Sequence, residues 1–302
     1  MKNTTFGLEV EFTGINRAAA ALAVAKVLSS RAVHVGGTYD SYQVADANGR
    51  NWKIVSDSSI RATDKAGRAA TPDFRCELVS PVCTYAGDIE LVQEIIRAIR
   101  KAGGVVNDTC GIHVHLDGRI QTVQSLKNWA AIVASKNDLL YRALQVPAPR
   151  IPYCQKIDAG LAIRFTPAKT LSALESAWYA IYGGAHGRFQ HYHSSRYHFL
   201  NLHSFFNGEH HTVELRGFNS TLHAGEVRAY IVLALALNQQ AITQKTARVA
   251  KPQVDNEKFA MRTYLNRLGL VGEEFATVRE VLTRNLTGCA AWRYGKPNAA
   301  AV

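Results

Sequence analysis

This 302-residue chain has few cysteines, and their spacing does not suggest pairs. Its cysteines number five, and no two of them are arranged as CxxC. An odd number without that spacing argues against a disulfide framework, so a reducing compartment is the expected environment. The five positions are Cys76, Cys83, Cys110, Cys154 and Cys289.

Long apolar runs are also missing. No stretch approaches the roughly 20 apolar residues that a membrane-spanning helix needs. The apolar run at 18–28 contains Lys26 and follows two glutamates, so it predicts an ordinary helix instead of a signal sequence. We therefore expect a cytoplasmic protein with no membrane partner.

Basic residues are numerous, yet they never form a run of five or more. Lys and Arg number 35 and Asp and Glu 24, which gives a formal charge of 35 − 24 = +11. This excess favours anionic partners such as nucleotides, phosphorylated or carboxylated substrates, or nucleic acid. The scattered positions exclude a polybasic tail, so the charge indicates only a general preference for anions.

The stretch at 6–12, FGLEVEF, predicts a short strand with a strict two-residue alternation. Its apolar side chains point to one face, and Glu9 and Glu11 point to the other. On its own, this pattern is compatible with an edge strand whose glutamates meet water. The alternative is a pair of carboxylates that share cations, and other parts of the chain favour it.

Strands and helices are predicted to alternate along the rest of the chain. Breaker-rich or period-free segments at 61–72, 145–170 and 183–195 predict loops with no readable substrate code. This pattern indicates one α+β domain over 1–302, with a sheet-bearing core at 4–220 and a helical part at 224–290. Strands are expected at 39–45, 52–55, 74–79, 111–116, 197–203 and 212–218, and helices at 17–30, 88–101, 123–144, 171–182 and in three segments after 224.

Three predicted strands each carry two polar residues at positions i and i+2, with apolar neighbours. Each pair therefore lies on one face of a strand whose opposite face is buried. Carboxylates gathered in this way cost several kcal/mol unless cations neutralise them. Mixed glutamate and histidine ligands suit Mg²⁺ or Mn²⁺ serving a nucleotide. The pairs are Glu9 with Glu11, His113 with His115, and Glu214 with Arg216.

Two further acidic residues belong to the same pattern. Glu77 lies on a predicted strand in apolar surroundings, within CELVSP. Asp57 follows a predicted strand and opens an Asp/Ser turn, where it either serves the site or simply forms the turn.

The order of these motifs resembles the amidoligase family, whose members are similar to glutamine synthetase and glutamate–cysteine ligase. The resemblance spans roughly residues 4 to 220 and rests on the order and pairing of motifs, since each motif alone is weak. The motifs are, in order, GLEVEF, WxxxxDSS, CELVSP, CGIHVHLD, YHFLNLH and TVELRGF.

The resemblance implies a curved, mostly antiparallel sheet that forms a funnel for ATP and metal ions, with helices packed outside. It implies an ATP-dependent carboxylate–amine ligase in which ATP phosphorylates a substrate carboxylate and an amine then displaces phosphate. Two or more Mg²⁺ ions, with Mn²⁺ as an alternative, would be held by Glu9, Glu11, Glu77, His113 and Glu214.

The resemblance also implies roles for residues beyond the metal ligands. His115 and Arg216 would contact the phosphates, and Asn201 would support the nucleotide or substrate side. Asp57 would lie near the amine, so that Arg216, Glu77 and Asp57 form the expected catalytic set.

The chain departs from the pattern of glutamine synthetase at two points. Only Glu77 is obvious on the side of the second metal, and Thr212 stands where an arginine commonly precedes the ExR pair. Arg196 or Arg188 is expected to supply the missing positive charge on the substrate side. His203 is a further candidate for that side, while His191 and His193 are expected in a loop that covers the funnel.

Two other functions are compatible with the sequence. A metal-dependent hydrolase would bind Zn²⁺ through His113 and His115 and use a carboxylate to activate water. A nucleic-acid-binding module would use the +11 charge, although the chain lacks a recognition motif. The charge could also serve an acid or amine carried on a larger anionic acceptor. The sequence identifies neither substrate.

Overall fold

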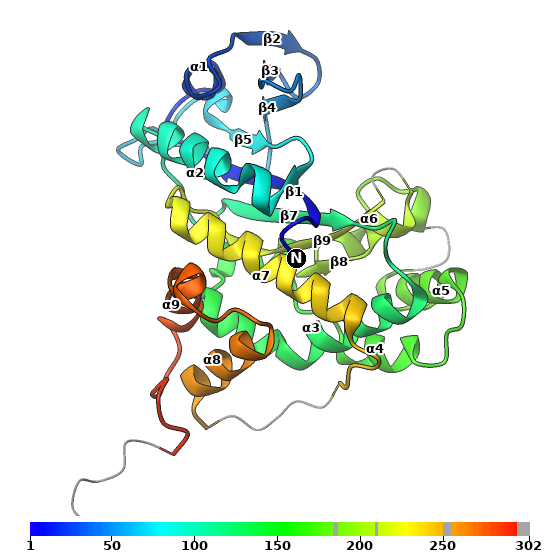
Figure 1. Cartoon of the computed structure of the whole chain (residues 1–302). Coiled ribbons are helices and arrows are strands. Elements are labelled where there is room, and N and C mark those ends of the chain that lie inside the picture. Colours follow the sequence, from blue (N-terminus) through cyan, green and yellow to red (C-terminus); the bar gives the residue numbers. More distant parts are fainter. Residues whose placement is uncertain (184–186, 209–210, 250–254, 295–302) are drawn as a thin grey trace, which may run out of the picture.

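In the computed structural model, residues 1–183, 187–208, 211–249 and 255–294 are described. They form an α+β fold built on one open sheet with the strand order β2-β3-β4-β5-β1-β7-β9-β8, while β6 pairs with β1 (Figure 1). Every paired strand is antiparallel to its neighbour. The strands are β1 Thr5–Phe12, β2 Ala32–Gly36, β3 Ser41–Ala45, β4 Asn51–Val55, β5 Cys76–Val79, β6 Cys83–Thr84, β7 Gly111–Asp117, β8 Leu200–Asn201 and β9 Thr212–Asn219.

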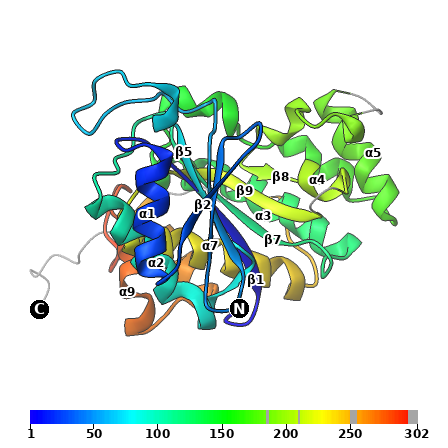
Figure 2. The ribbon, with the colours of Figure 1, turned by 90° about the horizontal axis from the view of Figure 1, so that it is seen from above.

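Helices cover one face of this sheet and extend beyond its β8 edge. Helices α1 and α2 lie beside the strands at the β2 end, and α7 runs beneath β1, β7 and β9 (Figures 1 and 2). None of the helices in the described residues is both long and apolar enough to cross a bilayer. The helices are α1 Arg17–Val27, α2 Tyr85–Lys101, α3 Val123–Leu144, α4 Ala159–Phe165, α5 Leu171–Tyr182, α6 His203–Phe206, α7 Ala224–Thr243, α8 Glu257–Arg267 and α9 Ala276–Thr283.

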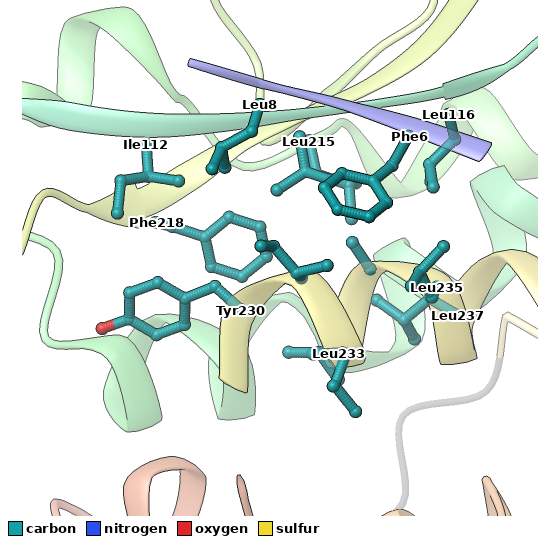
Figure 3. Close-up of a cluster of buried hydrophobic side chains, with 14 of the residues drawn as sticks. Phe6, Leu8, Ile112, Leu116, Leu215, Phe218, Tyr230, Leu233, Leu235 and Leu237 are labelled. Atoms are coloured by element: carbon teal, nitrogen blue, oxygen red, sulfur yellow. The ribbon is translucent and has the colours of Figure 1, made fainter. Parts of the chain in front are cut away.

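Strand β1 occupies the middle of the sheet, and its alternation is the one that the sequence predicts. Its four apolar side chains are at most 1% exposed and point toward the helical layer. Figure 3 shows Phe6 and Leu8 packed with apolar side chains of β7 and β9 above those of α7. Complete burial of each such side chain stabilises the fold by roughly 1.5–3 kcal/mol. This burial fixes the register, because a shift of one residue would place glutamates in the core.

The register brings the polar residues of neighbouring strands opposite each other on the uncovered face. On β1, Glu9 lies opposite His113 of β7, and Glu11 lies opposite Glu77 of β5. On the other side of β7, His115 lies opposite Glu214 of β9. The predicted i, i+2 pairs therefore form one continuous polar surface across four adjacent strands.

Strand β9 contains one extra residue relative to β7. Ile112 pairs with Phe218 and Val114 pairs with Leu215, so two residues of β9 lie opposite one residue of β7. This bulge lets both Leu215 and Phe218 face the core, which an unbroken alternation would forbid. Gly217 is required there because a Cβ would overlap the ring of Phe199.

Several predicted elements are confirmed, and three parts of the prediction are corrected. The helices predicted at 123–144 and 171–182 have those bounds in the structure. The sequence reading missed β2, which is an edge strand whose side chains show no buried alternation. It also treated 145–170 as irregular throughout, but that segment contains the 3-10 helix η2 at Ala148–Tyr153 and the helix α4, both too short to show a helical period.

The strand predicted at 197–203 is mostly wrong, because only Leu200 and Asn201 belong to β8. The side-chain Oδ1 of Asn201 accepts a hydrogen bond from the backbone N–H of His203 at 2.8 Å. This contact turns the chain into the short helix α6, in the way that Asn side chains initiate turns. His203 therefore lies on a helix and not on the strand face where its alternation had placed it.

The bulge makes Gly217 a test of the fold. Gly217→Ala should lower the free energy of unfolding by about 1–3 kcal/mol, because the added methyl group overlaps a buried ring. Gly7→Ala is the matched control on β1, where the new Cβ would meet only the Cβ of His115 at 3.5 Å. Urea denaturation of both variants measures the difference. Equal stabilities would show that the bulge tolerates a side chain.

Candidate functional site

Two adjoining cavities open on the uncovered face of the sheet. The larger has a volume of about 340 Å³ and the smaller about 240 Å³. All the residues that the sequence suggested as metal ligands, phosphate contacts or catalytic groups line at least one of them, together with Arg196 and His203. The larger cavity is lined by Glu9, Asp57, Glu77, His113, His115, Arg196, Asn201, His203, Glu214 and Arg216, and the smaller by Glu11, Asp57, His113, Arg196 and Arg216.

Among the described residues, three groups of ligand atoms lie close enough together to hold a cation. Within each group the atoms are no more than 4.8 Å apart. Glu9 belongs to two of the groups and Glu77 to two, so the groups form a connected row that runs from β9 to the end of β4. The groups are Glu9–His115–Glu214, Glu9–Glu77–His113 and Glu11–Asp57–Glu77.

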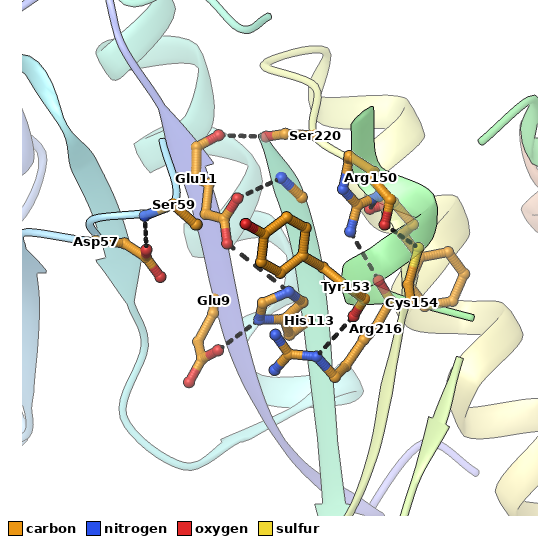
Figure 4. Close-up of polar contacts among 12 residues, drawn as sticks. Glu9, Glu11, Asp57, Ser59, His113, Arg150, Tyr153, Cys154, Arg216 and Ser220 are labelled. Carbon is orange, nitrogen blue, oxygen red and sulfur yellow. Dashed lines mark hydrogen bonds and ion pairs between the residues drawn. The ribbon is translucent and has the colours of Figure 1, made fainter. Parts of the chain in front are cut away.

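Glu9 makes the shortest carboxylate contacts to both histidines, and Glu214 Oε1 lies 3.9 Å from each of them (Figure 4 shows the contact between Glu9 and His113). His113 Nδ1 is 2.8 Å from Glu9 Oε2, and His115 Nε2 is 3.3 Å from Glu9 Oε1. Partial burial opposes the charge on Glu9, but the two imidazoles outweigh it and hold the pKa of this carboxyl well below its usual value. Glu9 is therefore ionised in the cation-free protein.

The two histidines differ in protonation. Burial, followed by the nearby Arg216, lowers the pKa of His113. Burial also opposes the charge on His115, yet Glu9 and Glu214 outweigh it and raise the pKa of His115 to about 9. Metal ligation requires a neutral imidazole. His113 is ready to ligate a cation at neutral pH, whereas His115 must first lose a proton.

Glu11 and Glu77 are both buried, and both have raised pKa values that favour their protonated forms. Burial, followed by the charge of Asp57, raises the pKa of Glu11 to about 8. Burial and the neighbouring carboxylates Glu9 and Glu11 raise the pKa of Glu77 well above its usual value. One oxygen of Glu11 accepts a hydrogen bond from the backbone N–H of Gly111 at 2.6 Å. In the cation-free protein, protons on Glu11 and Glu77 therefore reduce the negative charge at this end of the row, as a bound cation would.

Glu214 and Arg216 form the other end of the row. Arg216 Nη1 donates to Glu214 Oε1 at 2.6 Å, and Asn201 Nδ2 donates to Glu214 Oε2 at 2.6 Å. Burial disfavours the charge on Glu214 and the charge on Arg216, but each residue stabilises the charge of the other. The pKa of Glu214 falls to about 2, chiefly because of Arg216 and then His115, and the pKa of Arg216 rises above its usual value.

Asp57 both forms a turn and belongs to the site. Its Oδ1 accepts a hydrogen bond from Ser59 N at 2.7 Å, which is the local turn that the sequence allowed as the simpler interpretation. The same side chain lies in a ligand group with Glu11 and Glu77. The two interpretations of Asp57 are therefore compatible.

The two arginines that the sequence suggested for the substrate side, Arg196 and Arg188, lie in different places. Arg196 lines both cavities, and its guanidinium lies between the rings of Tyr192 and Tyr197, at 5.4 and 5.8 Å from their centroids. Arg188 instead forms an ion pair with Glu175 and lies outside both cavities. Of the two arginines that the sequence offered, only Arg196 reaches the site.

The histidines of the same loop also differ. His191 lines the larger cavity, whereas His193 is 4% exposed, hydrogen bonds to Ser195 and lines neither cavity. His203 lines the larger cavity and contacts the hydroxyl of Tyr179 at 2.7 Å. His186 lies outside the described residues.

Three site residues were missed by the sequence reading. Arg150 is 3% exposed and lines the smaller cavity, although it belongs to the crossover that had no readable pattern. Tyr39 and Tyr192 line the larger cavity, and their hydroxyl oxygens lie 3.5 Å apart. Exposed tyrosines on turns carry no sequence signal. Nothing in the sequence of the crossover distinguishes Arg150 from Arg164.

The donors fit a hard divalent cation. Carboxylate oxygens outnumber imidazole nitrogens, which suits Mg²⁺ or Mn²⁺ better than metals that prefer thiolate. Cys76 and Cys110 are fully buried, and burial raises the pKa of each thiol to about 12, so neither offers a thiolate. His115 Nε2 is buried without an aligned hydrogen bond despite its proximity to Glu9, as an atom facing a ligand position would be.

Comparison with known proteins agrees with this geometry. The family model described as "putative amidoligase enzyme" matches residues 2–238. The chain belongs to this amidoligase family. The match covers the nine strands of the described sheet. It also covers every residue named above as lining the two cavities. A search of curated proteins gives no match.

The geometry does not favour the zinc hydrolase alternative. Among the described residues, His113 and His115 fall in different ligand groups, joined only through Glu9. A zinc site built on the HxH strand would require both imidazoles in one group. The nucleic-acid interpretation gains no support beyond the +11 charge on which it was based.

The protonated carboxyls predict a pH-dependent response to cations. Glu11 has a pKa of about 8 in the fold against an ordinary value of 4.5, so its stabilising effect is complete below pH 4.5 and is lost as the pH rises to 8. The increase in melting temperature on adding Mg²⁺ should therefore be larger at pH 8 than at pH 6, because the cation replaces the lost proton. Calorimetry at the two pH values measures this difference.

Glu11→Gln is the matched variant, since it keeps the shape of the side chain without its titration. It should show a smaller difference between the two pH values than the wild type does. A wild-type increase that is the same at pH 6 and pH 8 would contradict the assignment of a buried proton to this end of the row.

Proposed function

We propose that this amidoligase is an ATP-dependent carboxylate–amine ligase that forms an amide or peptide-like bond through an acylphosphate. The observation that carries the proposal is the connected row of three ligand groups that ends at the paired Glu214 and Arg216. Carboxylates held within 4.8 Å of one another suit divalent cations, and the adjacent guanidinium suits a transferring phosphoryl group.

The metal-binding part of the proposal assigns Mg²⁺, with Mn²⁺ as the alternative, to the row. When bound, the cations would neutralise charge on the nucleotide phosphates and on the transferred phosphoryl group. Glu9 and Glu77 belong to two groups each and would bridge neighbouring ions. The proposed ligands are Glu9, Glu11, Glu77, His113 and Glu214.

The phosphate-binding part rests on the end of the row at β9. Arg216 is held by Glu214 and points along the cavity that His115 also lines. Both carry positive charge, which suits phosphate oxygens. Asn201 holds the other oxygen of Glu214 and so supports this end of the site.

The reaction would proceed in two balanced steps. First, an oxygen of the substrate carboxylate attacks the γ-phosphorus of ATP, and ADP leaves. Second, the amine nitrogen attacks the acyl carbon, the bond to the phosphate oxygen breaks, and inorganic phosphate leaves. The amine must also lose a proton, and Asp57, at the opposite end of the row from Arg216, would accept it.

Substrate binding would involve the residues that line the cavities away from the row. Arg196 is held between two tyrosine rings and would contact an anionic group of the substrate. His203 would lie on the same side. The curved sheet would act as the funnel expected of glutamine synthetase relatives, and the formal charge of +11 would favour a substrate carried on a larger anionic acceptor.

Phosphate release tests the proposal. The wild type should release phosphate from ATP in the presence of Mg²⁺ and of matched panels of carboxylates and amines. Glu9→Gln and Glu214→Gln should each lower this rate by about 10²-fold or more, since each removes an ionised ligand of the row. Glu94→Gln, on the exposed face of α2, is the control and should keep the wild-type rate.

The opposite outcome is equally clear. If ATP is turned over and both row variants keep the wild-type rate, the row is not the metal site. If turnover requires Zn²⁺ and no nucleotide, the hydrolase interpretation is the correct one.

A further inference from the structure

Arg150 is a buried cation whose hydrogen bonds all end on neutral acceptors. The residue lies in η2 and is 3% exposed. Its Nη1 donates to Phe218 O at 2.6 Å and to Asn219 Oδ1 at 3.3 Å, and its Nη2 donates to Arg216 O at 2.8 Å. Among the residues that the structure describes, no carboxylate forms an ion pair with it. Such a cation is costly to bury, so its hydrogen bonds must be retained.

The bulge in β9 explains why these acceptors are available. A bulged residue is left out of the regular ladder, and its backbone groups need other partners. The carbonyls of Arg216 and Phe218 lie on either side of Gly217, and one planar guanidinium reaches both (Figure 4 shows Arg150 beside Arg216). Arg150 thus donates to the backbone carbonyls on both sides of Gly217, at the position of the bulge.

The same short helix holds the side chain of Arg216. The Nε of Arg216 lies 3.5 Å from the backbone carbonyl of Tyr153, while its Nη1 donates to Glu214. The segment from Arg150 to Tyr153 therefore contacts Arg216 at its backbone and at its guanidinium. A shift of this segment would move both ends of the residue.

The space for Arg150 is provided by β7. A Cβ at Gly111 would overlap the guanidinium of Arg150, so a larger residue at this position would displace that guanidinium. The backbone N–H of Gly111 in turn donates to Glu11. Arg150 thus lies between the bulge of β9 and the strand β7, whose backbone binds Glu11.

We propose that Arg150 is a positioning residue that locks the bulge of β9 and thereby aims the guanidinium of Arg216 into the larger cavity. The proposal rests on the proposed function for its effect on catalysis. Its effect on the conformation of β9 does not depend on that function. The fork shape of the guanidinium is essential, because it presents several donors in one plane to two carbonyls at once.

The experiment compares Arg150→Met with a matched control, Arg279→Met. Arg279 also donates to two backbone carbonyls, those of Leu270 and Gly272, but lies on α9 away from both cavities. Two readouts are measured, the steady-state kinetics of phosphate release and the hydrogen exchange of backbone amides at 212–219. The loss of thermal stability is measured for both variants so that a general weakening can be recognised.

The expected result is a specific loss in Arg150→Met. The kcat should fall by about 10²-fold, as misplacement of a catalytic group by about 1 Å can cause, while the KM for ATP changes little. Exchange at 212–219 should become faster. Arg279→Met should keep the wild-type kcat and exchange at 212–219. A kcat in Arg150→Met equal to that of the control would overturn the proposal.

A conservative variant covers the case in which Arg150→Met does not fold. Arg150→Lys keeps the charge but places a single ammonium where two carbonyls need donors, so its kcat should still be at least about tenfold below the wild type. A wild-type kcat in Arg150→Lys would contradict the positioning role.

Failure of the proposed function gives a different pattern. If the wild type turns over no ATP, hydrogen exchange alone decides the question. Faster exchange at 212–219 in Arg150→Met or Arg150→Lys, but not in Arg279→Met, supports the lock on β9. Unchanged exchange in the arginine-150 variants overturns it.

Discussion

The register between β1 and its two neighbours is the constraint on which the site depends. The apolar face of β1 is buried against α7, which leaves its two glutamates on the opposite face. Antiparallel pairing then places His113 opposite Glu9 and Glu77 opposite Glu11. No loop has to fold into place for these groups to meet, because hydrophobic burial on one face of the sheet assembles the polar groups on the other.

Clustered acids on a half-buried surface must be neutralised, and the two ends of the row achieve this differently. At the β9 end, Glu214 is ionised and paired with Arg216, and His115 adds a second positive charge. At the β5 end, Glu11 and Glu77 retain protons that a divalent cation would displace. This difference is the basis for the proposed placement of the substrates, in which the phosphates bind at the cationic end of the row and the amine binds at the acidic end.

Most of this arrangement could be predicted from the sequence, because period-two alternation is a local signal. This alternation predicts the strands that carry Glu9, His113 and Glu214, and the helical period of apolar residues predicts the long helices. The bulge at Gly217 could not be predicted, because it depends on packing against Phe199. The turn at Asn201 could not be predicted either, because it depends on a hydrogen bond from its side chain to the backbone. Local patterns do not contain such tertiary information.

The crossover and the loops explain the remaining omissions. Arg150 contacts the bulge only in the folded chain, because the bulge is more than 60 residues away in sequence. Tyr39 and Tyr192 come from turns that meet across the cavity and share no motif. The residues that hold the site in shape are thus harder to predict than those proposed to perform its chemistry.

The central claim is that the row formed by Glu9, Glu77 and their neighbours holds divalent cations beside a nucleotide. Anomalous diffraction from crystals grown with Mn²⁺ and a non-hydrolysable ATP analogue tests it most directly. The account predicts two or more manganese peaks along the row, with Glu9 or Glu77 bridging neighbouring ions and phosphate oxygens on the side of Arg216. A nucleotide bound elsewhere, or a row without manganese, would contradict it.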